Sequence, residues 1–295
     1  MDVGMKTDLE DFLVGFRGQR ILFVPNPGNA GDSVIACAEY QLFDRLGINF
    51  RVISRDVSPS ETQGQIVFYS GGGNLVALYQ DAHDFIERHH KGVKQLVVLP
   101  HTIVAYPELL ASLGNNVDLI CREQLSHDYV ASFVSAARVH LMDDAAFSLD
   151  VERLLATAGI AGNAWFKRPL TTAKRSIRVL LHRFLNLRQR NKLNAFRSDI
   201  ESTGRWLEWG AKANFDVSNM FYPETMSALD SVLTARYMVR FINRFDVVRT
   251  DRLHVCIVSL LLGKEVHFYD NSYGKNRAVY EQSMLGRYSR LKWFG

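Results

Sequence analysis

Short apolar runs alternate with amphipathic segments along the first half of the chain. Residues 21–25 form an apolar run that predicts a buried strand, and residues 31–47 place apolar side chains at helical spacing. The same pattern predicts further strands at 50–53, 66–69, 96–99, 119–121 and 139–142, and helices at 79–91 and 123–133. Strands that alternate with helices indicate a parallel sheet covered on both faces.

A second series of elements follows a break in this pattern. Residues 150–175 contain a short helix, Gly159, Gly162 and Pro169, and we interpret them as a linker. Beyond it the pattern predicts strands at 177–181, 205–209, 214–217, 245–249 and 266–269, and helices at 186–203, 225–243, 252–262 and the C-terminus. We therefore predict an α/β protein of two doubly wound, Rossmann-like domains, residues 1–165 and 166–295, that face a cleft. Ligands of such folds bind at the carboxyl ends of the strands.

The composition is that of a globular protein. Of the 295 residues, 47% are hydrophobic and 22% are charged, which excludes a disordered chain and a disulfide-stapled miniprotein. Cys37, Cys121 and Cys256 are far apart in apolar runs, without the Cys/His spacing of a zinc site, so we expect buried thiols and no metal. The first twenty residues lack the apolar core of a signal peptide, and the longest apolar run, 255–262, is too short to span a bilayer. We therefore expect a soluble cytoplasmic protein.

The positive charge is concentrated in one segment. Lys and Arg number 35 against 31 Asp and Glu, a net charge of +4, and residues 167–205 hold eleven Lys or Arg but only Asp199 and Glu201 as acids. The aromatic residues there, Phe184 and Phe196, are not interleaved as stacking platforms, so we expect no nucleic-acid partner. A solvated basic face is the simplest interpretation, and contact with anionic lipid head groups or with a lipid-linked acceptor is the alternative.

Two glycine-containing turns follow the first and third predicted strands. The first, at 26–33, includes Asn29, Gly31 and Asp32 ahead of a predicted helix, where backbone N–H groups can meet an anion or a hydroxyl-rich ligand. The alternative is a plain tight turn with Asp32 as helix cap. The second has three successive glycines, 71–73, before Asn74, which fits close approach of a ligand to the backbone or a flexible connector.

The next three strands each end in titratable residues: His101, then Arg122 and Glu123, then Asp143 and Asp144. A single His at a strand end is more often structural, and Glu123 is favoured at a helix start by the dipole. Adjacent residues on one segment point apart, so Asp143 and Asp144 are not a carboxylate pair by themselves.

The most specific pattern is the segment 250–254, Thr-Asp-Arg-Leu-His, between a predicted strand and a predicted helix. Arg252 and His254 fall in the first turn of that helix, where the helix dipole disfavours cations. Two potential cations at the positive end of the helix dipole are unfavourable unless an anion binds between them. The same anion would accept hydrogen bonds from the backbone N–H groups of the first turn. The alternative is a partly exposed Arg and a core His. The next strand leads into a polar loop, 270–275, that ends in a further cation, Lys275.

Taken in order along the chain, these motifs resemble the polysaccharide pyruvyl transferase family. The resemblance rests on Asn-Ala-Gly-Asp at 29–32, Gly-Gly-Gly-Asn at 71–74, Leu-Pro at 99–100, Arg-Glu at 122–123, Asp-Ala-Ala-Phe at 144–147, and the segments 250–254 and 270–275. It implies transfer of a pyruvyl group from phosphoenolpyruvate to a sugar of an exopolysaccharide unit, commonly as a cyclic ketal. It also implies an architecture similar to that of GT-B glycosyltransferases.

The resemblance further implies roles for individual residues. On the donor side, in the second domain, these are Arg252, Leu253, His254 and Lys275, with Arg183 matched by its position after residues 177–181. On the acceptor side, in the first domain, they are Asn29, Gly31, Asp32, Gly72, Gly73, Asn74 and His101. His101 departs from the family pattern, because relatives often have Gln there. No cofactor is implied beyond phosphoenolpyruvate as the donor substrate.

The chemistry of that donor fits these residue types. Arginines such as Arg252 and Arg183 bind carboxylate and phosphate groups bidentately. A proton added to the methylene carbon activates the enol ether, and His254, with an ordinary pKa of about 6.5, is the candidate acid. Asp32 is the leading candidate base for the sugar hydroxyl, with Asp143 or Asp144 as alternatives.

Two other functions are open on the sequence alone. A nucleotide-sugar-dependent glycosyltransferase of similar fold would use the same cleft, and an RNA-binding or membrane-surface module would use the basic segment. Release of a nucleoside diphosphate from a nucleotide sugar would indicate the first. Salt-sensitive binding to liposomes would indicate a membrane-surface module.

Overall fold

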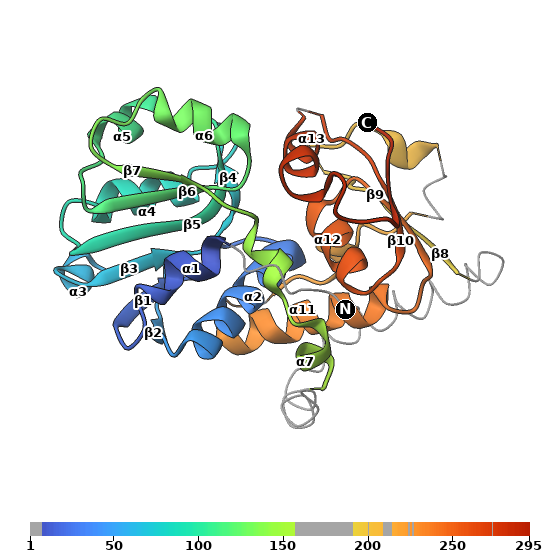
Figure 1. Cartoon of the computed structure of the whole chain (residues 1–295), viewed down its shortest axis with the longest axis horizontal. Helices are drawn as coiled ribbons and strands as arrows, with labels where there is room; N and C mark the ends of the chain where they lie inside the picture. The colour runs from blue at the N-terminus through green and yellow to red at the C-terminus, as the bar shows by residue number, and fades with distance from the viewer. Residues whose placement is uncertain are drawn as a thin grey trace.

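The computed structural model describes residues 8–156, 191–199, 201–208, 214–223, 225, 227–272 and 274–295. Within them the chain forms two parallel β-sheets, one in each half, with helices packed around both (Figure 1). The first half is drawn in blue to green and the second in yellow to red. The predicted fold class, α/β with two Rossmann-like units, is confirmed.

The first half is built on a seven-stranded parallel sheet in the order β2-β1-β3-β5-β6-β7, with β4 paired to the end of β5. Every strand that the sequence predicts in this half is present, and the glycine-rich β4 is additional. The strands are β1 (Arg20–Val24), β2 (Asn49–Val52), β3 (Ile66–Tyr69), β4 (Gly72–Leu75), β5 (Gln95–Ile103), β6 (Val117–Cys121) and β7 (Arg138–Leu141).

Side chains of this sheet alternate between two buried faces. Ile21 and Phe23 of β1 belong to one hydrophobic cluster, whereas Leu22 and Val24 belong to the other. Burial on both faces explains why the inner strands β1, β3, β5 and β6 are mostly apolar. The helices of this half are α1 (Asp8–Val14) and α2 (Ala30–Leu46) on the first face, and α3 (Pro59–Thr62), α4 (Asp81–His89), α5 (Pro107–Ser112) and α6 (Gln124–Ala131) on the second.

The second half contains a four-stranded parallel sheet in the order β11-β10-β9-β8. Its strands are β8 (Lys192–Ala195), β9 (Val247–Thr250), β10 (Glu265–Phe268) and β11 (Leu291–Trp293). The helices α11 (Ala228–Ile242) and α12 (Leu253–Leu261) match the predicted ones. The predicted C-terminal helix is present as α13 (Lys275–Val279), which continues into a π-helical turn, η3 (Tyr280–Met284).

Three predictions for this half are wrong where the chain is described. The helix predicted over 186–203 is replaced by β8, because pairing with β9 decides between two states that the apolar spacing fits equally. The strand predicted at 205–209 is replaced by a 3-10 turn, η2 (Arg205–Leu207), which follows Gly204 with a φ of 78°. The strand predicted at 214–217 reduces to one bridge, from Asn214 to Asn194, before α10 (Val217–Met220). The strand predicted at 177–181 lies outside the described residues.

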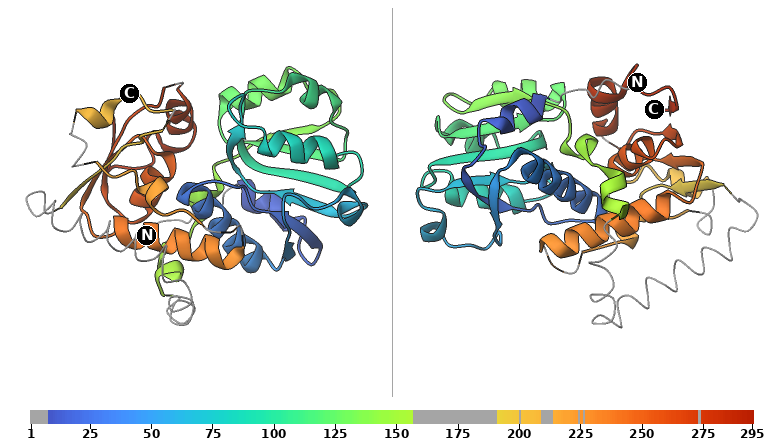
Figure 2. Two further views of the ribbon diagram at one scale, coloured as in Figure 1. Left: turned by 180° about the vertical axis from the view of Figure 1, so that it is seen from behind. Right: turned by 60° about the horizontal axis from the view of Figure 1, so that its bottom comes forward.

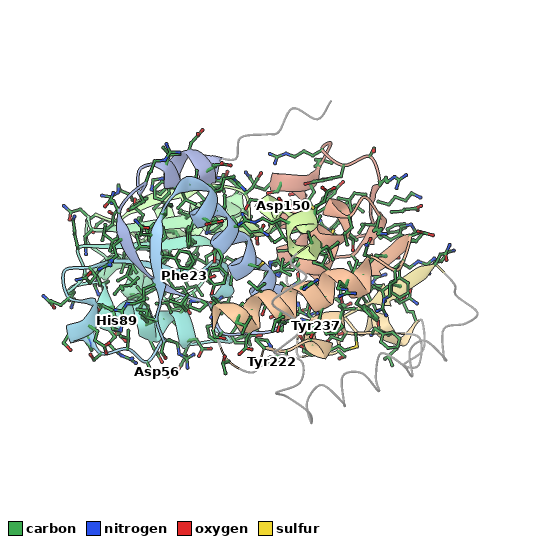
Figure 3. All side chains as sticks on the ribbon, turned by 90° about the horizontal axis from the view of Figure 1, so that it is seen from below. Phe23, Asp56, His89, Asp150, Tyr222 and Tyr237 are labelled. Carbon is green, nitrogen blue, oxygen red and sulfur yellow. The ribbon has the colours of Figure 1, made fainter. Side chains whose placement is uncertain are left out.

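The two halves share one hydrophobic core. The helix α2 of the first half packs along α11 of the second, and Figure 2 shows them side by side in both views. One buried cluster accordingly contains Val34 of α2, Val239 of α11 and Val258 of α12. Figure 3 gives the view from below, with Phe23 in the first half and Tyr237 on α11.

The connection between the sheets runs through η1 (Ala145–Ser148) and α7 (Val151–Ala156). The first sheet ends at Leu141 and the second begins at Lys192, so the predicted domain boundary at 165/166 falls outside the described residues and stays a prediction. No helix in the described part of the chain is both long and apolar enough to cross a membrane.

Candidate active site

A cavity of about 560 Å³ lies between the two halves, at the carboxyl ends of strands from both sheets. This is the position that the fold predicts for a ligand. Residues of the first half that line it are Pro27, Gly28, Asn29, Asp32, Arg55, Gly73, Asn74, Tyr79, Asp81 and Arg122. Residues of the second half are Arg197, Asp199, Glu201, Ser218, Asn219, Tyr222, Arg252, Leu253, His254, Lys275 and Asn276.

His254 lies where the first turn of α12 meets the first turn of α2. A Cβ on Gly31 would lie only 2.6 Å from His254 Nδ1, so glycine is required for the imidazole to fit. On the other side, His254 Nε2 lies 3.4 Å from Asp144 Oδ2. The imidazole is therefore held between the start of α2 and a buried carboxylate.

Asp144 serves two partners at once. Its Oδ2 atom, which faces His254, also accepts a hydrogen bond of 2.6 Å from Arg122 Nη1, and both of these side chains have 0% exposure. Burial alone would raise the pKa of Asp144, but the charge of Arg122 and the contact with His254 hold it well below its ordinary value. The resulting carboxylate holds the His254 imidazole in its orientation at the cavity.

Asp32 lies beside His254 at the start of α2. Asp32 Oδ2 accepts a hydrogen bond of 2.8 Å from the Asn29 backbone, and Asn29 Oδ1 accepts one of 2.8 Å from the Gly31 backbone. This reciprocal capping box begins the helix and fixes both side chains at the cavity. Burial raises the pKa of Asp32 above its ordinary value, although the nearby His254 and Lys275 lower it in part. A carboxyl group with a raised pKa is suited to accept a proton near neutral pH.

Arg252 is the N-cap residue of α12, and two carboxylates hold its guanidinium. Its Nε and Nη2 atoms donate to the two oxygens of Asp216 at 2.9 and 2.6 Å, and Nη2 also lies 2.8 Å from Asp199 Oδ2. The side chain is 6% exposed. Charge compensation at the start of α12 therefore comes from the protein's own acids as well as from any bound anion.

A second arginine extends this network across the cavity. Arg197 Nε donates to Asp199 at 2.8 Å, and Arg197 Nη1 pairs with Glu201. Glu201 in turn accepts a hydrogen bond of 3.0 Å from the Tyr79 hydroxyl, which belongs to the first half. This contact joins the two halves at the cavity wall.

Arg122 and Lys275 approach each other over Gly73. A Cβ on Gly73 would lie 2.9 Å from Arg122 Nη2 and closer still to Lys275 Nζ, so only glycine leaves room for both cations. Burial first, and then the charge of Arg122, lower the pKa of Lys275 to about 8, against a raising effect of Glu201. Arg122 comes from the end of β6 and Lys275 from the start of α13, so the pair also spans the two halves.

His101 lies behind the cavity and does not line it. The side chain is fully buried, and its Nε2 atom lies 2.8 Å from Asn74 Oδ1 and 3.2 Å from the Asn74 backbone nitrogen. Burial first, and then the charge of Arg122, lower its pKa well below the ordinary value, so the ring is neutral. Direct contact of His101 with an acceptor is therefore contradicted by the geometry, because it can act only by holding Asn74.

The structure brings most of the predicted residues to one cavity. Those that line it are Asn29, Asp32, Gly73, Asn74, Arg252, Leu253, His254 and Lys275. Gly31 packs behind His254, and Gly72 lies against Asn26 and His101, so both act through close packing. Arg183 lies outside the described residues and stays a prediction.

The two alternative bases do not fit. Asp143 does not line the cavity. It accepts hydrogen bonds from Ser283 Oγ at 2.7 Å and from Arg287 Nη1 at 2.6 Å. Asp144 is committed to Arg122 and has a lowered pKa. Among the candidates, this leaves Asp32 as the carboxyl group placed to accept a proton.

Sequence reasoning missed the site roles of Arg122, Arg197, Asp199 and Glu201. One signal was present: the two acids of the basic segment 167–205 stand at alternate positions after Arg197. Both acids contact Arg197 at the cavity, and Asp199 also contacts Arg252. Within the described residues, no group of three or more His, Cys, Asp or Glu is arranged to hold a metal ion.

Two parallel α/β halves around a cavity lined by arginines, a lysine, a histidine and several carboxyl groups have the layout of an enzyme active site. Comparison with known proteins agrees with this class. The sequence profile of the polysaccharide pyruvyl transferase family matches residues 29–273. The chain belongs to this family and is a polysaccharide pyruvyltransferase.

Individual relatives support the assignment. EpsO of Bacillus subtilis (strain 168), a protein named for pyruvyl transfer, is 25% identical over 289 residues, covering 89% of this chain and 84% of that protein. A crystal structure of a functionally uncharacterized protein from Klebsiella pneumoniae is 30% identical, covers 98% of this chain and 97% of that chain, and has a TM-score of 0.76. This second likeness covers almost the whole chain and supports the two-sheet fold of the described residues.

Proposed function

We propose that the protein transfers the pyruvyl group of phosphoenolpyruvate to two hydroxyls of a sugar in an exopolysaccharide unit, forming a cyclic ketal and releasing phosphate. The observation that carries this proposal is that His254 and Asp32 line one cavity, among cations from both halves. The pair supplies one group to donate a proton and one to accept it. The cations supply the charge that a donor with carboxylate and phosphate groups requires.

The proposed reaction begins with proton transfer from His254 to the methylene carbon of the donor. The double bond becomes a methyl group, and the neighbouring carbon takes on oxocarbenium character. The first sugar hydroxyl adds to that carbon and gives its proton to Asp32. Phosphate then leaves with the electron pair of its C–O bond and takes the proton from Asp32, the second hydroxyl adds, and its proton returns to His254. One donor and one diol thus yield one ketal and one inorganic phosphate.

The start of α12 is suited to the carboxylate of the donor. The first turn of a helix leaves backbone N–H groups without partners inside the helix, and Leu253 and His254 of this turn line the cavity. Arg252, held by Asp216 and Asp199, fixes the orientation of that turn. A carboxylate bound there would lie next to the imidazole that supplies the proton.

The first half supplies the surface proposed for the sugar. Asn74 and Asp81 line the cavity with groups that can bond sugar hydroxyls, and Tyr79 adds an aromatic side chain. We place the reaction in the cytoplasm, and a lipid-linked acceptor would extend it to the inner face of the membrane. Flotation with liposomes that carry anionic lipid tests that extension, which fails if the protein does not bind in a salt-sensitive manner.

The experiment is an assay of phosphate release from phosphoenolpyruvate with a panel of nitrophenyl hexopyranosides as acceptors. We expect acceptor-dependent release by the wild type, and a loss of about 10²-fold or more in His254→Gln and Asp32→Asn. His127→Gln is the matched control, because His127 is a surface residue that pairs with Asp128. Full activity of His254→Gln would contradict the acid assignment. Release of a nucleoside diphosphate from a nucleotide sugar would instead indicate a glycosyltransferase.

A further inference from the structure

Arg122 is a fully buried cation whose guanidinium is almost completely fixed by the protein. Its Nε donates to Thr102 Oγ1 at 3.0 Å, and its Nη1 donates to Asp144 at 2.6 Å. Its Nη2 makes no hydrogen bond to any described residue, although it is buried. An orphaned guanidinium nitrogen in a protein interior is costly, and it is expected where a ligand completes the contact.

That nitrogen lies beside Gly73 in the cavity wall, next to the ammonium group of Lys275. Gly73 lies between the two cations, and all three residues line the cavity. The positive charges of Arg122 and Lys275 repel each other there. After burial, this repulsion is the next largest cause of the lowered pKa of Lys275. An oxyanion that contacts both groups would satisfy Arg122 Nη2 and remove the repulsion.

We propose that Arg122, Lys275 and Gly73 form a phosphate subsite separate from the start of α12. The assignment of this subsite to the phosphate of the donor rests on the proposed function. Arg252 is less suited to that role, because Asp216 and Asp199 already compensate its charge. The donor would then lie with its phosphate at Arg122 and its carboxylate at α12, which places the reacting carbon between them, next to His254.

The arrangement also connects the bound phosphate to the acid. Asp144 Oδ2 contacts both Arg122 and His254. A dianion on Arg122 would compete with Asp144 for the guanidinium, so binding at the subsite would be felt at the carboxylate that orients His254.

The test is calorimetric titration of the full chain with two probes, inorganic phosphate and pyruvate. Lys275→Gln removes the ammonium at similar length, and Gly73→Ala fills the point that both cations approach. Lys264→Gln is the control. Within the described residues, the Lys264 side chain donates one hydrogen bond, to the Asn243 carbonyl, and it does not line the cavity. We expect phosphate to bind at least tenfold more weakly to both site variants, with pyruvate binding changed less than twofold in Lys275→Gln.

A second readout covers the case in which Gly73→Ala fails to fold. At about pH 8 the wild type should take up protons when phosphate binds, because a bound anion raises the pKa of Lys275 from about 8, and Lys275→Gln should lose this uptake. Unchanged phosphate affinity in Lys275→Gln, or a larger loss for pyruvate than for phosphate, would overturn the proposal. If phosphate binding follows the variants while the wild type does not turn over phosphoenolpyruvate, the subsite stands and the proposed function fails.

Discussion

Asp144 is the residue on which both the stability and the chemistry of the site depend. It is fully buried, and it is the partner of Arg122, which is fully buried as well. Removal of one member of a buried ion pair leaves the other charge without compensation, which costs more than the pair itself contributes. The same carboxylate orients His254, so the proposed acid is held by a contact that the fold cannot easily lose.

Asp144→Asn should therefore lower the free energy of unfolding by about 3 kcal/mol, measured by urea denaturation. Asp44→Asn is the control, because Asp44 pairs with Arg153 at the surface and should change stability by less than about 1 kcal/mol. Equal effects of the two substitutions would show that Arg122 does not depend on Asp144.

Glu39 is a buried carboxyl group that fixes the glycine turn behind the site. Glu39 Oε1 accepts a hydrogen bond of 2.8 Å from the Gly71 backbone, and Oε2 accepts one of 2.5 Å from Ser70 Oγ. Burial raises the pKa of Glu39 to about 8 from an ordinary value of 4.5. Between these two values the folded state holds a proton that the unfolded state has lost.

The stability of the wild type should therefore fall as pH rises from about 5 to about 8, by up to about 1.4 kcal/mol per pH unit relative to Glu39→Gln. Glutamine preserves the neutral form of the side chain and has no proton to lose. Urea denaturation of both proteins at several pH values measures the difference. Parallel pH profiles would mean that Glu39 is ionised in the folded protein.

At the scale of elements, the site depends on how closely α2 and α12 approach each other. A Cβ on Gly31 would meet His254 Nδ1 at 2.6 Å, so Gly31→Ala must displace the imidazole. We expect a loss of kcat of about tenfold or more with little change in the melting temperature. Gly15→Ala is the matched control, because a Cβ there meets only the Phe12 carbonyl, at 3.4 Å. Unchanged kcat in Gly31→Ala would show that the position of His254 does not limit the reaction.

The elements also show what the sequence can and cannot predict. The strands of the first half other than β4 were predictable because each contains apolar residues bounded by turns, and the segments after β1 and β3 contain Asp32 and Asn74, which line the cavity. The strand β8 was not predictable from its own residues. It is short, and its pairing with β9, which places Leu193 beside Val248, is seen only in the fold. The phosphate subsite was not predictable either, because Gly73, Arg122 and Lys275 meet only through the fold.

At the scale of the whole molecule, the shared core should make the two halves unfold together. Val239 of α11 is fully buried in the cluster that also contains residues of α2. Val239→Ala removes two methyl groups and should cost about 2 kcal/mol. Hydrogen exchange in β9 and β10 reports on the second half, and hydrogen exchange in β3 and β5 reports on the first.

Both probes should show the same loss of stability in Val239→Ala. A change confined to β9 and β10 would mean that the halves are independent folding units. In that case the cavity between them would not be held in shape by the packing of α2 against α11.

The central claim is that a proton is added to the donor carbon and that a ketal is formed. The most direct test is the NMR spectrum of the saccharide that the wild type produces from phosphoenolpyruvate in D₂O. We predict a pyruvate ketal whose methyl group carries one deuterium from the solvent, with one inorganic phosphate released per ketal. A product that retains the methylene group as an enol ether, or a saccharide without an added pyruvyl group, would contradict the account.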